Sequence, residues 1–257
     1  MIIAAGSLEY AQARLSARYG ERPDELAWRR VEHVRTFPAL LDAARTSALR
    51  GWLPGIAPIS TPHAIEQALR GHWRDLVAEI ASWMPDGWHD AVLWCTALVD
   101  LPILQHLARG GAALPWMRDD AVYRELCERE SAGFGTAPTG GPLMPLAAAW
   151  SDPDRIGGLW LAEWRRRMPE GEGDDDATRN AVGRALAAHL AALRDPSLRT
   201  GTALRRALQT RLEVLFRRAM LDPAAAFAFI ALTAIDLERF RGELLRRAAF
   251  PGLPLLA

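Results

Sequence analysis

The sequence contains no lysine, and all 31 of its basic residues are arginine. A Walker-type phosphate-binding loop needs a lysine that reaches the β- and γ-phosphates, and Schiff-base catalysis needs a lysine amine, so the chain belongs to neither class. Arginine, alanine, proline and glycine are all abundant, which is typical of GC-rich coding sequence. This bias explains the missing lysines without reference to function.

The sequence also has few cysteines and no net charge. Cys95 and Cys127 are the two cysteines, too few for a disulfide scaffold or a multi-cysteine zinc site. The arginines are balanced by 31 acidic residues, whereas proteins that bind nucleic acid usually carry a basic surplus. The sequence therefore predicts no nucleic-acid partner.

Long apolar runs and targeting patterns are absent as well. The longest uncharged apolar stretches are Pro223–Ile235 and Ala91–Val99, whereas a membrane-spanning helix needs roughly 20 such residues. We expect both stretches to be buried core helices. Residues 1–6 lack the basic start and the long apolar run of a secretory signal, so we expect a protein that stays in the cytosol.

Catalytic patterns are missing in the same way. The six histidines show no HExxH spacing, the serines lack a GxSxG context, and the glycine-rich segment has GxG without GxGxxG. The acidic run Asp174–Asp176 invites comparison with motifs that hold magnesium pyrophosphate, but Thr178 stands one helical turn after Asp174, which favours a solvated loop. We expect no catalytic residue, cofactor or metal site.

What the sequence does show is helical periodicity, so the fold class is predicted to be all-α. After Thr61 and Pro62, a fitting N-cap and first-turn residue, apolar side chains recur at steps of three and four and end before Pro85. Strand-like alternation between hairpin turns is absent. The stripe comprises Ile65, Leu69, Trp73, Leu76, Ile80 and Trp83.

The glycine- and proline-rich stretch Gly133–Pro145 suggests a division of the chain. We expect an N-terminal helical lobe over residues 1–116, a linker over 117–149 and a C-terminal helical lobe over 150–257. Asp100 and Asp236 each follow an apolar segment and precede leucine, and both are plausible N-caps. This weak echo would make the two lobes related copies.

Two surface features are candidates for binding. Trp52 and Trp116 lie beside glycine or proline in expected loops and could contact a partner, although core packing is the usual role of tryptophan. The run Arg165–Arg167 could meet an acidic partner or lipid headgroups, but it would also satisfy a helix C-terminus.

Short motifs at both ends of the chain carry a family resemblance. The segment Leu8–Arg18 combines Tyr10 with Arg14 and Arg18, and Phe37–Leu41 follows it. Asp100–Leu104 follows an apolar segment. Near the C-terminus, Asp236 and Arg241 lie in a leucine-rich segment that precedes Phe250–Pro254.

This order resembles the family of the C-type central-stalk adapter in V/A-type rotary ATPases, whose eukaryotic counterpart is the d-type adapter. The resemblance covers roughly residues 8–110 and 205–254. Family members usually have three related helical lobes, whereas this chain has room for two, and Ile103 replaces an asparagine of the family pattern.

The resemblance implies a funnel-like, all-α, non-catalytic adapter without cofactors. Such an adapter links the rotating central shaft to the membrane rotor ring and transmits torque during ATP-coupled ion transport. It associates peripherally with the cytoplasmic face of the membrane through these protein partners. The resemblance also implies that Arg241 pairs with a carboxylate or helix-end carbonyls of the neighbouring lobe, and that Arg239, which has no family counterpart, tolerates replacement.

Two other functions remain open on the sequence. The chain could be a soluble helical binding or scaffold module unrelated to rotary ATPases, since the resemblance rests on short motifs. Less favoured is an all-α metal-dependent enzyme that uses Asp174–Asp176.

Overall fold

The computed structural model describes residues 6–128, 137–169, 176–192 and 201–250. Every regular element within these ranges is a helix, which confirms the all-α class. The α-helices are α1 (Leu8–Gly20), α2 (Glu25–His33), α3 (Phe37–Arg45), α4 (Pro62–Trp83), α5 (His89–Trp94), α6 (Leu101–Ala108), α7 (Arg124–Glu128), α8 (Ile156–Arg166), α9 (Asp176–Ala192), α10 (Gly201–Arg218) and α11 (Ala224–Ala249). Short 3₁₀ helices are η1 (Ala48–Trp52), η2 (Asp86–Trp88), η3 (Cys95–Asp100), η4 (Pro115–Arg118), η6 (Met144–Ala149) and η7 (Pro153–Arg155).

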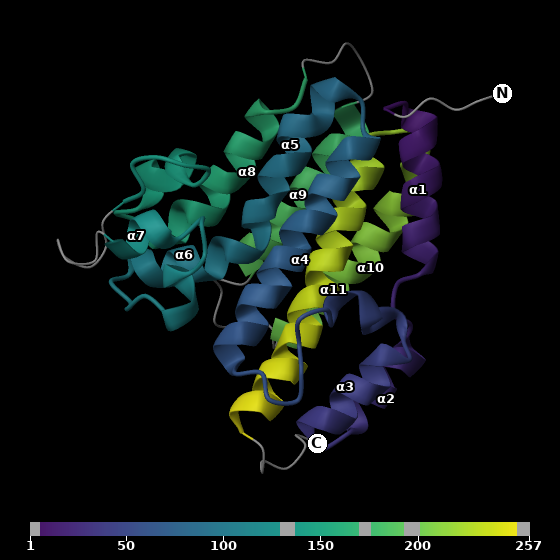
Figure 1. The fold of residues 1–257 in the computed structure, drawn as a ribbon. Coiled ribbons are helices and arrows are strands. Elements are labelled where there is room, and N and C mark those ends of the chain that lie inside the picture. The colour runs from purple at the N-terminus through teal and green to yellow at the C-terminus, as the bar shows by residue number, and fades with distance from the viewer. Residues whose placement is uncertain (1–5, 129–136, 170–175, 193–200, 251–257) are drawn as a thin grey trace.

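The two longest helices, α4 and α11, lie side by side through the middle of the molecule (Figure 1). Helix α11 also packs on α1, α9 and α10. Its first eleven residues, 224–234, are all buried, as expected for the apolar run that they form. A helix buried on every side must be apolar all round, which is why this run shows no amphipathic stripe.

Helix α4 forms where its caps and apolar stripe predict. Thr61 accepts a hydrogen bond from the backbone N–H of Ala64 at 3.2 Å, and Pro62 lies in the first turn, where its missing N–H costs nothing. Leu69 and Trp73 are fully buried, and the Trp73 indole donates to the backbone carbonyl of Thr96 at 2.9 Å. The stripe thus anchors α4 in the core.

One stretch is apolar enough to cross a membrane by length and composition. It covers Asp86–Ala108, and 56% of its most apolar window is buried in the structure. Its path consists of η2, α5, η3 and α6 in succession rather than one straight α-helix. Core helices of soluble proteins pass the same test, so the finding carries little weight for a membrane span.

The halves of the chain share one buried cluster. Val31 and Leu40 from the first half and Phe240 and Leu244 from the last helix belong to it. The segment 117–149, expected to be a linker, adds Tyr123 and other described side chains to the same cluster, while residues 129–136 lie outside the described part. The division into lobes and the funnel shape stay predictions.

Trp116 corrects one expectation. The residue is 3% exposed, and its ring packs edge-on against Tyr123, with 5.2 Å between the ring centroids, so Trp116 is a core residue rather than part of a partner surface. The segment around it folds into η4, which rests on α4. The adjacent Pro115 favoured an exposed loop in the sequence, but tertiary packing buries this segment.

Candidate functional site

The family-pattern residues of α1 fasten this helix to α4. Arg18 donates from Nη2 to both carboxylate oxygens of Glu79, each at 2.8 Å. Arg14 lies 3.6 Å from the same carboxylate, and its guanidinium stacks over the ring of Trp83 at 5.0 Å from the centroid. Tyr10 is half-buried against the core. Arg14 and Arg18 thus hold α1 against α4.

Asp236 is not an N-cap, which corrects the sequence expectation. Helix α11 already begins at Ala224, where Asp222 accepts a hydrogen bond from the backbone N–H at 2.7 Å, so Asp236 lies in the middle of the helix. Its buried carboxylate accepts a hydrogen bond from Arg22 Nε at 2.8 Å. Burial raises the pKa of Asp236, and the charge of Arg22 opposes this rise.

Asp100 stands at the N-cap position of α6, but its side chain makes no capping hydrogen bond. The carboxylate instead accepts a hydrogen bond from Arg70 of α4. Burial raises the pKa of Asp100, opposed mainly by the charge of Arg70. The expected capping role is therefore wrong. An unpaired buried carboxylate costs more free energy than an uncapped helix N-terminus, so the side chain pairs with Arg70 instead.

Arg241 reaches across the molecule. Its Nε donates to Glu66 Oε1 of α4 at 2.8 Å, and Nη1 donates to Glu238 at 3.3 Å. Arg241 therefore pairs with a carboxylate of another helix, whereas the expectation that this helix belongs to a neighbouring lobe stays a prediction. Burial alone would lower the pKa of Arg241, but the bonds and charges of Glu66 and Glu238 outweigh it and raise the pKa.

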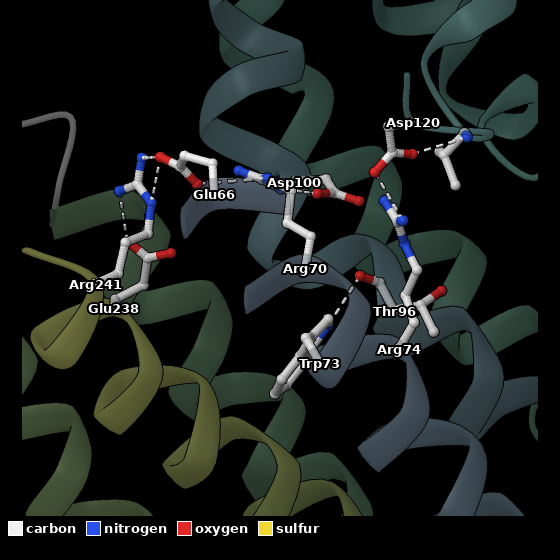
Figure 2. A network of polar contacts seen from close by, with 10 residues as sticks. Glu66, Arg70, Trp73, Arg74, Thr96, Asp100, Asp120, Glu238 and Arg241 are labelled. Atoms are coloured by element: carbon white, nitrogen blue, oxygen red, sulfur yellow. Dashed lines mark hydrogen bonds and ion pairs between the residues drawn. The ribbon is translucent and has the colours of Figure 1, made fainter. Parts of the chain in front are cut away.

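These contacts form a group of ion pairs along α4, which we call the α4 network (Figure 2). Arg70 lies between Glu66, at 3.7 Å, and Asp100. One turn further along α4, Arg74 pairs with Asp120 at 2.8 Å. The network extends from α11 through α4 to η3 and the turn after η4. Its residues are Glu66, Arg70, Arg74, Asp100, Asp120, Glu238 and Arg241.

Aromatic rings seal part of the network. The guanidinium of Arg70 stacks over Trp116 at 4.5 Å from the ring centroid and lies 6.0 Å from the centroid of Tyr123. Arg70 and Asp100 are each at most 6% exposed as side chains. A buried ion pair of this kind is costly to break by removal of one partner, because the other charge is left uncompensated.

Residues of α1, α4, α11 and η1 line an open cleft of about 290 Å³. Arg18, Arg22, Glu79 and Asp236 line it, together with the half-buried Trp52. The four charged side chains all pair with one another across the cleft or with neighbouring groups. The exposed carboxylate of Asp75 also lines the cleft, beside these paired charges.

Metal ligands do not converge in the part of the chain that the structure describes: no group of three or more His, Cys, Asp or Glu side chains is placed to hold an ion there. Asp174 and Asp175 lie outside the described residues, and the side chain of Asp176 is not described. The structure therefore does not test the hypothesis that the chain is a metal-dependent enzyme that uses Asp174–Asp176.

The run Arg165–Arg167 has internal partners for its last two members. Arg166 and Arg167 both donate to Glu163, and Arg167 also pairs with Asp90 at 2.9 Å. Its guanidinium stacks over Trp94 at 4.4 Å from the centroid. These contacts favour the structural interpretation of the run over a partner surface.

Sequence reasoning missed most of the α4 network. Glu66, Arg70 and Arg74 follow one another at intervals of four, a spacing that brings side chains onto one helical face. The spacing alone is typical of a solvated charged face. Only the tertiary fold shows that Asp100, Asp120 and the end of α11 bury it.

Comparison of the chain with protein-family models, with curated proteins and with solved structures finds no match.

Proposed function

We propose that this chain is a non-catalytic central-stalk adapter of a V/A-type rotary ATPase. It would link the rotating shaft to the membrane rotor ring at the cytoplasmic face. The proposal rests on the order of the family-like motifs, and the single structural observation that supports it is where their charged residues lie. Arg14, Arg18, Asp100, Asp236 and Arg241 each make an ion pair to another helix or segment.

The physical link between these ion pairs and torque is stiffness. An adapter that turns with a shaft must not shear internally, so its helices need contacts that resist sliding past one another. Close-packed cores and buried, directional ion pairs both resist such motion. Arginines of α1 pair with Glu79 of α4, and Arg241 of α11 pairs with Glu66 of α4. Ion pairs therefore fix the three helices to one another.

Affinity capture tests the proposal. The chain is tagged in its native cell, membranes are solubilised in mild detergent, and the captured proteins are identified by mass spectrometry. The proposal predicts recovery of the shaft and ring proteins of one rotary ATPase in fixed ratio with the chain. Recovery of the chain without any ATPase component, from a cell whose intact ATPase is purified in parallel, would contradict it and leave a helical binding module as the better interpretation.

A further inference from the structure

A second cavity lies on the other side of α11 from the cleft. It is a partly open pocket of about 230 Å³, lined by residues of η3 and of helices α6, α8, α9, α10 and α11. Its wall includes Leu101 and Pro102 of the family-like segment Asp100–Leu104, but none of the charged residues of the family-like motifs that make the ion pairs described above. Only Glu238 belongs both to its wall and to the α4 network.

The wall of this cavity is mainly hydrocarbon. Leu98, Leu190, Leu208 and Ala234 contribute aliphatic surface, and Trp160 contributes its ring. The Trp160 indole N–H is already used by the backbone carbonyl of Trp94, at 3.4 Å, so the ring presents no polar atom that needs a partner. An apolar cavity of about 150 Å³ already binds benzene, so this one accommodates a ligand the size of two fused rings.

Three polar side chains converge on the same cavity: His189, Arg205 and Glu238. Burial, assisted by the charge of Arg205, lowers the pKa of His189, so its imidazole is neutral near pH 7. Burial raises the pKa of Glu238, and the charges of Arg241 and Arg205 oppose this rise; its carboxylate accepts a hydrogen bond from Arg241 at 3.3 Å. The neutral imidazole can donate or accept one hydrogen bond with a ligand. The carboxylate of Glu238 can accept one.

The charges around the cavity already compensate one another. Glu238 of the wall is faced by Arg241, which binds it, and by Arg205, which also lines the cavity. A charged ligand in this apolar space would leave one charge unbalanced and would lose its own hydration. The balance favours an uncharged ligand.

We propose that this cavity binds a small, uncharged, largely apolar molecule with a single hydrogen-bonding end, of the size and chemistry of a bicyclic aromatic alcohol. The apolar body contacts Leu98, Trp160 and Leu208, and the hydroxyl hydrogen-bonds to Glu238 or His189. This proposal does not rest on the proposed adapter function, because it is argued from the lining of the cavity alone.

A matched probe series tests the charge preference. Binding of 2-naphthol, 2-naphthoate and 2-(aminomethyl)naphthalene to the full chain is measured by isothermal titration calorimetry at pH 7. We expect 2-naphthol to bind at least tenfold more tightly than either charged probe. Equal or tighter binding of the anion or the cation would overturn the proposal, as would absence of 2-naphthol binding at its solubility limit.

Cavity-filling variants test the location. Ala234→Phe should reduce 2-naphthol affinity at least tenfold, whereas Ala188→Phe, on α9 at a position that does not line the cavity, should leave it unchanged. If Ala234→Phe does not fold, Leu98→Trp fills the cavity from a half-exposed position. Unchanged binding in a folded cavity-filling variant would overturn the location.

Charge balance and occupancy complete the test. Arg205→Gln should increase the affinity for the cationic probe several-fold, because it leaves Glu238 undercompensated, whereas Arg206→Gln on the exposed side of α10 should not. No difference between the two arginine variants would overturn the charge argument.

Light scattering at the working concentration shows whether a second copy of the chain covers the cavity. A dimer that dissociates in Leu98→Trp would overturn the small-ligand assignment.

Discussion

Leu69 shows how single residues hold this fold. Its side chain is 1% exposed at the centre of the α4 stripe. Leu69→Ala removes buried hydrocarbon and leaves a cavity, so we expect it to lower the free energy of unfolding by about 2–5 kcal/mol. Urea denaturation followed by tryptophan fluorescence measures this loss. A loss below about 0.5 kcal/mol, the range of surface substitutions, would show that this face of α4 is not packed as described.

Asp236 carries a second prediction at the residue scale. Asp236→Ala leaves the guanidinium of Arg22, 11% exposed, without its main partner, although Glu213 remains 3.6 Å away. We expect a loss of about 3 kcal/mol in the free energy of unfolding, larger than the loss of an N-cap. Asp42→Ala, at an exposed position paired only with Arg45, is the control and should change stability by less than about 1 kcal/mol. Equal losses in the two variants would contradict the buried pair.

Helices α11 and α4 are coupled through Arg241, and this coupling sets a prediction at the scale of elements. Arg241→Ala removes the cation that bridges Glu66 and Glu238 and leaves Glu66 only its longer contact with Arg70 at 3.7 Å, so we expect a loss of about 2 kcal/mol in the free energy of unfolding. Under the proposed function, rotor binding should fall further than this loss explains. Arg217→Ala, an exposed position on α10, is the control. Equal rotor binding by the two variants would remove the residue-level support for the adapter.

Arg239 is not a suitable control, which corrects the sequence expectation. Its Nε donates to Glu32 at 2.6 Å, and its guanidinium stacks over Trp28 at 4.4 Å from the ring centroid. It therefore ties α11 to α2, and its replacement is expected to weaken that contact. The absence of a family counterpart said nothing about these local partners.

The sequence predicted elements better than it predicted partners. The caps and stripe of α4 and the apolar run of α11 depend on neighbours within a few residues, so periodicity and capping chemistry reveal them. The roles of Asp100 and Asp236 depend on Arg70 and Arg22, which are remote in sequence. A local rule assigns each aspartate to the nearest helix N-terminus, and only the tertiary fold supplies the competing guanidinium.

At the scale of the whole molecule, buried carboxyl groups make stability depend on pH. Burial raises the pKa of Asp100 above its unfolded value, so the folded state holds this proton more tightly. The stabilisation is complete below the unfolded pKa, about 4, and is lost as pH rises through the folded pKa. The stability advantage of the wild type over Asp100→Asn should therefore shrink as pH rises from 4, as measured by urea denaturation at several pH values.

Glu163 makes stability depend on pH in the opposite direction to Asp100. The hydrogen bond from Arg166 lowers its pKa, so its contribution is present above its unfolded pKa and is lost as pH falls through its folded pKa. The advantage of the wild type over Glu163→Gln should thus shrink as pH falls. The same slope for both variants would contradict the assigned burial of Asp100.

ATP-driven charge transport in membrane vesicles tests the adapter claim most directly. Vesicles from the native cell are depleted of this chain, and ATP hydrolysis and membrane potential are recorded together, the potential with a dye that responds to any coupling ion. The account predicts that depletion abolishes the ATP-driven potential while hydrolysis persists, and that adding back the wild-type chain restores the potential. A full ATP-driven potential in depleted vesicles would contradict it.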